Sequence, residues 1–214
     1  MTEVRTVDHV VIGLGGLGAG AAYWLAKLGQ DAERNEVIVG LEQFELGHDK
    51  GASHDHSRII RHSYHTPEYV KLASEAYETW DAVAAEAGEE LVVRTGGIDI
   101  FPEGSVIPIS DYTSSLEANN IPFEVLDAHE MMSRFPQFSV ESGVQVLFQK
   151  DTGIAPAAKG TDAHHRLAAA RGVELRTNAS VNRIESDGAG GLAVVTDDCI
   201  YQTGSVIICA DGWT

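Results

Sequence analysis

Cations are scarce in this chain, yet two arginines and several histidines lie together in residues 51–69, GASHDHSRIIRHSYHTPEY. The 214 residues include 15 Lys+Arg against 32 Asp+Glu, a formal net charge of −17. A guanidinium is a planar fork of N–H donors that binds a carboxylate through two hydrogen bonds. Arg58 and Arg61 are therefore candidates for binding an anion, and their i, i+3 spacing would place them on one side of a helical turn. The alternative is that they form surface ion pairs with the many acidic residues.

Histidine is the other residue type concentrated in this segment. His54, His56, His62 and His65 offer imidazole nitrogens, but their spacing matches no familiar zinc pattern and no cysteine pair accompanies them. We therefore expect no metal site. Most of these histidines are expected to be exposed or to form ordinary hydrogen bonds in a loop.

A glycine-rich segment near the N-terminus has the pattern of a dinucleotide-binding turn. The largely apolar segment HVVI at 9–12 predicts a short buried parallel strand, and Gly13, Gly15 and Gly18 then form G-x-G-x-x-G. The first glycine permits the sharp turn, the second lets backbone N–H groups approach a pyrophosphate, and the third lets the helix pack closely on the strand. The helix N-terminus adds unpaired N–H donors and a partial positive charge.

The residues after the glycines complete a strand–helix–strand unit. We expect a helix from Leu17 that ends at Gly29 as its C′ glycine, and then the strand EVIVGLE, which ends at Glu42. An acid at the end of this strand can accept hydrogen bonds from an adenosine ribose. Because the spacing from the glycines is longer than usual, Glu36 and Glu45 are alternatives to Glu42.

Four segments together resemble the flavin-dependent amine oxidase family, of the DAO type: GLGGLG at 13–18, LEQFELGH at 41–48, GASHDHSRIIRHSY at 51–64 and RTGGIDIF at 94–101. The resemblance is greatest to its monomeric sarcosine oxidase, N-methyltryptophan oxidase and pipecolate oxidase branch, and it covers essentially the whole chain. It implies an α/β fold in which a Rossmann-like FAD-binding domain is interleaved with a sheet-rich substrate domain. We expect the N-terminal half of that fold, with residues 1–89 and 156–214 binding FAD and residues 90–155 beginning the substrate domain.

The resemblance also implies roles for individual residues. Arg58 would lie close to the flavin ring, where a positive charge stabilises the anionic reduced ring, and Arg61 would pair with the substrate carboxylate. His54 is the third residue implied in catalysis. The residues implied in FAD binding are Gly13, Gly15, Gly16, Leu17, Gly18, Glu42, Gln43, Ser53, Ser57, Arg58, Val181, Ala210 and Gly212. In the closing IICADGW turn, Asp211 stands where the family commonly has glycine, so the contact there is open.

The implied reaction is oxidation of a secondary or N-methyl amino acid to an imine, with hydride equivalents passing to FAD and O2 reduced to hydrogen peroxide. The partners would be a small amino-acid substrate and O2, with a missing C-terminal half or a second chain completing the enzyme. An NAD-dependent dehydrogenase and a non-catalytic nucleotide-binding subunit completed by a second chain are the alternatives.

Composition excludes several other classes of protein. The negative charge argues against nucleic-acid or anionic-lipid partners, and no apolar run reaches the roughly 18 residues of a membrane helix. The N-terminus lacks a signal-peptide layout, so a cytoplasmic protein is expected. Cys199 and Cys209 lack CxxC spacing and are expected to be buried free thiols.

Local signals place the remaining helices. Thr66 is a good N-cap for a helix that ends at Gly88, and Asp127 begins a capping box. The segment TDAHHRLAAARG predicts another helix, on which we expect His164 and His165 to lie at the surface.

Overall fold

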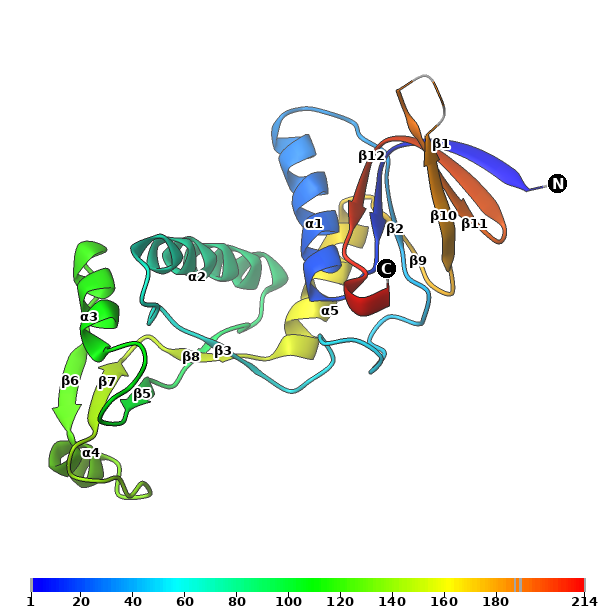
Figure 1. Cartoon of the computed structure of the whole chain (residues 1–214). Coiled ribbons are helices and arrows are strands. Elements are labelled where there is room, and N and C mark those ends of the chain that lie inside the picture. The colour runs from blue at the N-terminus through cyan, green and yellow to red at the C-terminus, as the bar shows by residue number, and fades with distance from the viewer. Residues whose placement is uncertain (1, 187, 189, 214) are drawn as a thin grey trace. The chain divides into compact units, whose positions relative to one another are not determined.

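The computed structural model describes residues 2–186, 188 and 190–213. The chain divides into two compact units (Figure 1). Unit 1 contains the residues up to His56 together with those from Pro156 onward, and unit 2 is Ser57–Ala155. Unit 1 combines helices with a sheet that contains parallel strands, which confirms the α/β class expected from the sequence.

Unit 1 is built on one six-stranded sheet. Its strands are β1 (Glu3–Ile12), β2 (Ile38–Leu41), β9 (Glu174–Arg176), β10 (Val181–Ser186), β11 (Leu192–Thr196) and β12 (Cys199–Ile208). The order is β10-β11-β12-β1-β2-β9, in which β12, β1, β2 and β9 run parallel and β10–β12 form an antiparallel meander. Its helices are α1 (Gly16–Asp31) and α5 (Ala157–Ala170), which pack against each other beside the parallel strands (Figure 1).

Two boundaries in unit 1 differ from the expected ones. β1 begins at Glu3, well before the apolar residues 9–12, because it pairs with β12 along its whole length. α1 continues past Gly29, so the assignment of Gly29 as a C′ glycine is wrong. A Cβ at Gly29 would lie 2.7 Å from Glu36 Oε2, so a larger residue there would require the Glu36 side chain to move.

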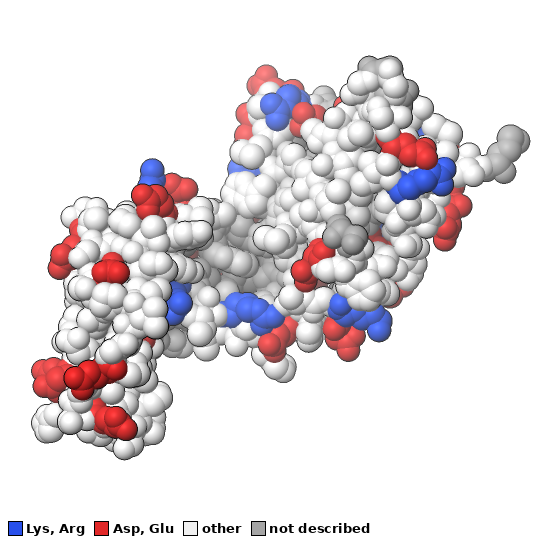
Figure 2. Space-filling view, viewed as in Figure 1, with Lys and Arg blue, Asp and Glu red and all other residues white. Residues whose placement is uncertain are grey.

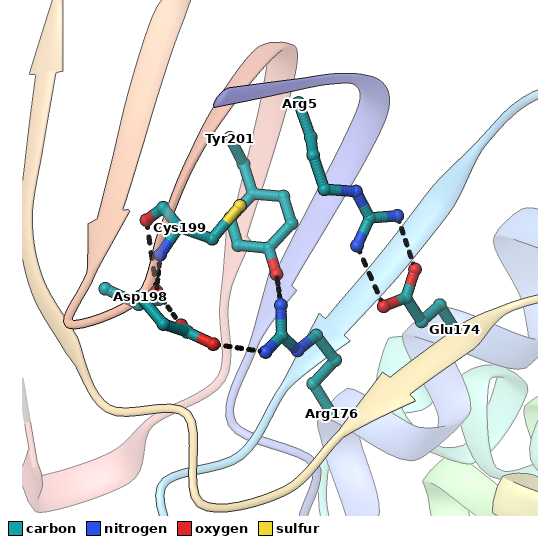
Figure 3. A network of polar contacts seen from close by, with 7 residues as sticks. Arg5, Glu174, Arg176, Asp198, Cys199 and Tyr201 are labelled. Atoms are coloured by element: carbon teal, nitrogen blue, oxygen red, sulfur yellow. Dashed lines mark hydrogen bonds and ion pairs between the residues drawn. The ribbon is translucent and has the colours of Figure 1, made fainter. Parts of the chain in front are cut away.

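A network of charged and polar side chains joins β1, β9 and β12 in unit 1 (Figure 3). Arg5 donates two hydrogen bonds to Glu174, at 2.9 and 2.5 Å. Arg176 donates to the hydroxyl of Tyr201 at 2.5 Å and to Asp198 at 2.6 Å. The Arg5 guanidinium holds the pKa of Glu174 below its usual value, whereas burial raises the pKa of Tyr201. These contacts fasten the sheet across strands that are distant in sequence.

Unit 2 combines three helices with two small sheets. The helices are α2 (Pro67–Ala87), α3 (Ile109–Ala118) and α4 (Ala128–Arg134). One sheet has the order β3-β8-β4, with β3 Arg58–Ile60, β8 Gly153–Ala155 and β4 Val93–Arg94. The other has the order β5-β7-β6, with β5 Gly97–Phe101, β7 Gln145–Gln149 and β6 Glu124–Asp127. Thr66 and Gly88 flank α2, and Asp127 forms a capping box with Glu130, as the sequence predicts.

The boundary between the units lies earlier than the expected domain boundary. Residues 57–89, which were expected with the FAD-binding part, pack within unit 2, and the assignment of 1–89 and 156–214 to FAD binding stays a prediction. The reason is packing, because Val70 of α2 shares a buried cluster with Leu116 of α3 and Leu147 of β7.

The segment that carries Arg58 and Arg61 also differs from expectation in its secondary structure. Arg58 opens the strand β3 and lies opposite Ala155 of β8, so the two arginines are not on a helical turn. The segment is extended because it pairs with β8. Residues i and i+3 of an extended chain do not share a face.

Surface charge follows the composition. Acidic side chains are spread over the face drawn in Figure 2, with basic ones among them. None of the helices in the described part of the chain combines the length and apolar character that crossing a bilayer requires.

Candidate functional site

A cavity of about 680 Å³ opens in unit 1 where the parallel strands end. Ile12, Leu41 and Ile208, the last residues of β1, β2 and β12, line it together with Gly16 and Leu17 of α1. Open α/β sheets bind ligands outside the carboxyl ends of their strands. The volume is within the range of about 300–1,000 Å³ for small-molecule and cofactor sites.

The glycine-rich turn forms one wall of this cavity, and the structure shows why two of its glycines are required. Gly13 has φ +83°, and a Cβ there would lie 2.6 Å from the carbonyl oxygen of Cys209. A Cβ at Gly18 would lie 1.7 Å from the carbonyl oxygen of Gly13. The first glycine therefore permits the turn, and the third lets α1 approach the strand, as the motif predicts.

The N-terminal end of α1 faces the cavity. Gly15 is the N-cap and supplies no side chain to the first N–H groups of the helix. Ser53, from the loop after β2, reaches this end, and its Oγ accepts a hydrogen bond of 2.9 Å from the Gly16 N–H. Helix N-termini favour anions through their unpaired N–H donors and the helix dipole. Ser53 adds a hydroxyl donor beside them.

Glu42 is buried at the end of β2, with 5 % of its surface exposed. Its Oε2 accepts from the Leu14 N–H at 2.9 Å and its Oε1 from the Phe44 N–H at 3.1 Å. His48 Nε2 lies 3.3 Å from the same Oε1. Because the Lys50 N–H donates to His48 Nδ1 at 3.0 Å, the imidazole proton is on Nε2 and points to Glu42. The carboxylate is thus held in one orientation.

His48 is a site residue that sequence reasoning did not identify. It lies in the loop after β2, and it contacts the acid that was predicted to bind a ribose. A loop has no periodicity that would relate His48 to Glu42, so composition and spacing carried no signal of this contact. Orienting contacts of this kind are common around residues that bind ligands.

The prediction that His164 and His165 lie at the surface of their helix is wrong. They are 7 % and 6 % exposed, because α5 packs on α1. His165 Nε2 lies 2.7 Å from the carbonyl oxygen of Leu14 in the glycine-rich turn, and His165 also lines the cavity. His164 Nδ1 lies 2.7 Å from the Gly160 carbonyl. The small residues Gly160 and Ala168 lie on the buried face of α5. Their spacing in the sequence could have predicted that both histidines lie on this buried face.

Burial lowers the pKa of both His164 and His165 below the ordinary value of 6.5. The unfolded chain then binds protons more readily than the folded chain between these lowered pKa values and pH 6.5. We expect these two histidines to lower the free energy of unfolding as the pH drops below 6.5, and to contribute little change well above it. The slope has an upper limit of about 1.4 kcal/mol per pH unit for each histidine.

Urea unfolding between about pH 5 and pH 8 measures this dependence. His165→Gln keeps a side-chain donor for the Leu14 carbonyl and is expected to flatten the slope. The exposed His129→Gln serves as the control and should leave the slope as in the parent protein. Equal slopes for the His165 variant and the parent would contradict the prediction.

Most of the predicted site residues come together at the cavity. The predicted residues that line it are Gly13, Gly15, Gly16, Leu17, Glu42, Gln43, Ser53, His54, Val181 and Ala210. The other predicted residues lie elsewhere: Gly18 is buried in α1, Gly212 is in the turn η1 (Asp211–Trp213), and Ser57, Arg58 and Arg61 belong to unit 2.

The closing turn of the chain contributes two further residues to the cavity wall. Asp211 lines the cavity and has φ 52°, a left-handed conformation that glycine adopts more easily. Trp213 donates from Nε1 to the Lys50 carbonyl at 3.2 Å, and its ring meets that of Phe44 edge to face at 5.6 Å. The turn and the loop after β2 thereby enclose the cavity from two sides.

Both cysteines are free thiols as expected, but only one is fully buried, and Arg61 forms the ion pair that the sequence left as an alternative. Cys199 is buried and Cys209 half-buried, and neither forms a disulfide. Arg61 Nη1 lies 2.5 Å from Asp99 Oδ1. Arg58 is exposed and donates from Nη1 to the Ser57 carbonyl at 2.8 Å.

The clustered histidines are dispersed in the structure. His54 Nδ1 contacts the Gly51 carbonyl at 2.6 Å, and His62 is buried and stacked on Tyr77 at 4.3 Å. His65 lies near the ring of Tyr112. Within the described residues, no three His, Cys, Asp or Glu side chains group in a way that would hold a metal ion.

Known protein structures share this fold. NikD, described as an unusual amino acid oxidase essential for nikkomycin biosynthesis, superposes with a TM-score of 0.84 and 24% identity, over 98% of this chain and 52% of its own. Glycine oxidase from Geobacillus kaustophilus gives a TM-score of 0.80 at 19% identity, over 98% and 56%. At these identities the likeness shows the fold.

Sequence comparison gives the family. Monomeric sarcosine oxidase of Streptomyces avermitilis is 33% identical over 97% of this chain and 52% of its own length. N-methyl-L-tryptophan oxidase of Yersinia pestis is 28% identical over 96% and 54%. The chain thus spans about half the length of these curated relatives. Residues 8–214 match the family model described as DAO, FAD dependent oxidoreductase. The chain therefore belongs to the DAO family of FAD-dependent oxidoreductases, which confirms the family and the cofactor predicted from the sequence.

Proposed function

We propose that the protein is the FAD-binding part of an enzyme that oxidises a secondary or N-methyl amino acid to an imine and reduces O2 to hydrogen peroxide. In this proposal, unit 1 binds FAD and Arg61 of unit 2 binds the substrate carboxylate. The single observation that carries it is the cavity at the carboxyl ends of β1, β2 and β12, with its glycine-rich turn and the end of α1. The names of the sarcosine and N-methyltryptophan oxidases that the chain resembles support the substrate class.

The residues of the cavity fit FAD. The backbone N–H groups near Gly15 and the Ser53 hydroxyl suit the diphosphate, because they are donors at a helix N-terminus. Glu42, fixed by two N–H groups and His48, keeps acceptor capacity for a ribose hydroxyl. Val181 lines the same cavity, and the family resemblance implies that it contacts the adenine side of FAD.

FAD, when bound, supplies the acceptor for a hydride equivalent and passes the electrons on to O2. The chain's own contribution is to bind and orient. Arg61 would fix the carboxylate through a two-pronged contact, and orientation of a substrate is a large part of catalysis in reactions of this kind. Arg58 and His54 are proposed contributors on the strength of the family resemblance.

Anaerobic flavin reduction tests the function. The FAD-loaded enzyme is mixed with sarcosine, N-methyltryptophan, pipecolate or proline, and bleaching of the flavin absorbance is followed before air is admitted. We expect at least one of these secondary amino acids to reduce the flavin and to yield hydrogen peroxide after air is admitted. A flavin that none of them reduces would reject the proposed substrate class. A nicotinamide cofactor in place of flavin would reject the proposal as a whole.

A further inference from the structure

Unit 2 contains a three-residue cluster around Arg61. Arg61 Nη1 lies 2.5 Å from Asp99 Oδ1, and the hydroxyl of Ser63 donates to Asp99 Oδ2 at 2.5 Å. Ser63 is fully buried, and the guanidinium lies 5.5 Å from the ring centre of Tyr64. Both carboxylate oxygens of Asp99 are therefore engaged by the segment that carries Arg61.

The fold determines the position of Asp99. It is the central residue of β5 and lies opposite Leu147 of β7. Its neighbour Ile98 packs against the buried cluster around Met131 and Val146 on the other face of the sheet. The Asp99 side chain is 23% exposed, compared with 36% for Arg61. Asp99 is thus a fixed, largely shielded carboxylate next to the arginine proposed to bind substrate.

This arrangement changes what Arg61 can bind. Its charge is already balanced by Asp99, so a second carboxylate would give the cluster a net negative charge unless the ligand brought its own cation. The guanidinium still has N–H donors besides the one that contacts Asp99, so a carboxylate can be bound without displacing the pair. Two like charges in a partly shielded site repel each other much more strongly than in water.

We propose that Asp99 determines substrate specificity: it disfavours amino acids with an additional negative charge and favours those with an additional positive one. The proposal rests on the proposed function, in which Arg61 holds the substrate carboxylate. The ligands selected would be zwitterionic or basic secondary amino acids, and acidic ones would be rejected.

Asp99→Asn tests the charge with little change of shape, since the amide oxygen still accepts from Arg61. In the FAD-loaded enzyme, the ratio of kcat/KM for N-methyl-lysine to that for N-methyl-glutamate is expected to fall by about tenfold in the variant. A second measurement needs neither turnover nor flavin. NMR titration with acetate is expected to give a dissociation constant about tenfold lower for Asp99→Asn than for the parent.

Two further variants separate charge from geometry. Ser63→Ala keeps the Asp99 charge and is expected to retain the substrate ratio of the parent. Asp111→Asn removes an exposed acid at the start of α3 and should change neither the ratio nor the acetate affinity.

Weaker or unchanged acetate binding by Asp99→Asn would overturn the proposal, because it would mean that Asp99 only orients Arg61 or does not influence it. Failure of the proposed function is recognised separately. The parent enzyme would then show no flavin reduction with any secondary amino acid, while the acetate titration would still decide the role of Asp99.

Discussion

Replacing Gly18 with alanine is expected to destabilise unit 1 by more than about 4 kcal/mol and to abolish FAD binding. The added Cβ would lie 1.7 Å from the Gly13 carbonyl oxygen and 3.3 Å from the Cβ of Cys209. The first of these contacts is with backbone, which no side-chain rotation can relieve, so α1 would have to move away from the sheet. Urea unfolding followed by circular dichroism measures the loss.

Gly20→Ala is the matched control for this experiment. Gly20 lies in the same helix, and a Cβ there would meet nothing within 4 Å. Alanine has the higher helix propensity, so we expect Gly20→Ala to be neutral or to stabilise by up to about 1 kcal/mol. Unfolding of the Gly18 and Gly20 variants at the same urea concentration would refute the assignment of Gly18 to helix–strand contact.

Replacing Arg61 with alanine is expected to lower kcat/KM for the proposed amino-acid substrate by about 100-fold while FAD stays bound. The loss should be mainly in KM, because the substrate carboxylate loses a charged partner that binds it through two hydrogen bonds. The substitution also leaves the Asp99 carboxylate without its cation. Arg61→Lys keeps the charge but not the planar fork, so an intermediate loss is expected.

Arg134→Ala provides the comparison for Arg61. Arg134 forms an exposed ion pair with Glu124 at 2.7 Å. Exposed ion pairs of this kind contribute little to stability, so Arg134→Ala should leave the steady-state kinetics unchanged. Equal kinetics for the Arg61 variant and the parent enzyme would remove Arg61 from the substrate site.

Local chemistry explains which parts of the fold could be predicted from sequence. The turn at Gly13, the caps of α2 at Thr66 and Gly88, and the capping box at Asp127 depend on residues a few positions apart. Such signals are complete within a short stretch of sequence. These elements were therefore placed correctly.

Long-range packing explains the features that were missed. β3 is a strand because it pairs with β8, which follows far along the chain. His164 and His165 are buried because α1 covers their face of α5. None of these contacts joins residues that are neighbours in sequence.

The candidate site shows the same division. The glycines and Glu42 followed from a motif with a known physical basis. Two contacts could be identified only from the folded chain: His48 contacts Glu42, and His165 contacts the Leu14 carbonyl in the glycine-rich turn. The contact of Asp99 with Arg61 likewise depends on the placement of β5 beside the segment after β3.

Comparison of FAD with riboflavin tests most directly whether the N-terminal end of α1 binds a diphosphate. The two ligands share the isoalloxazine ring, and riboflavin lacks the diphosphate and the adenosine. Titration of the apoprotein, followed by flavin fluorescence, is expected to show FAD binding at least about 100-fold more tightly, with ADP displacing it competitively. Equal affinities for FAD and riboflavin, with no effect of ADP, would contradict this account.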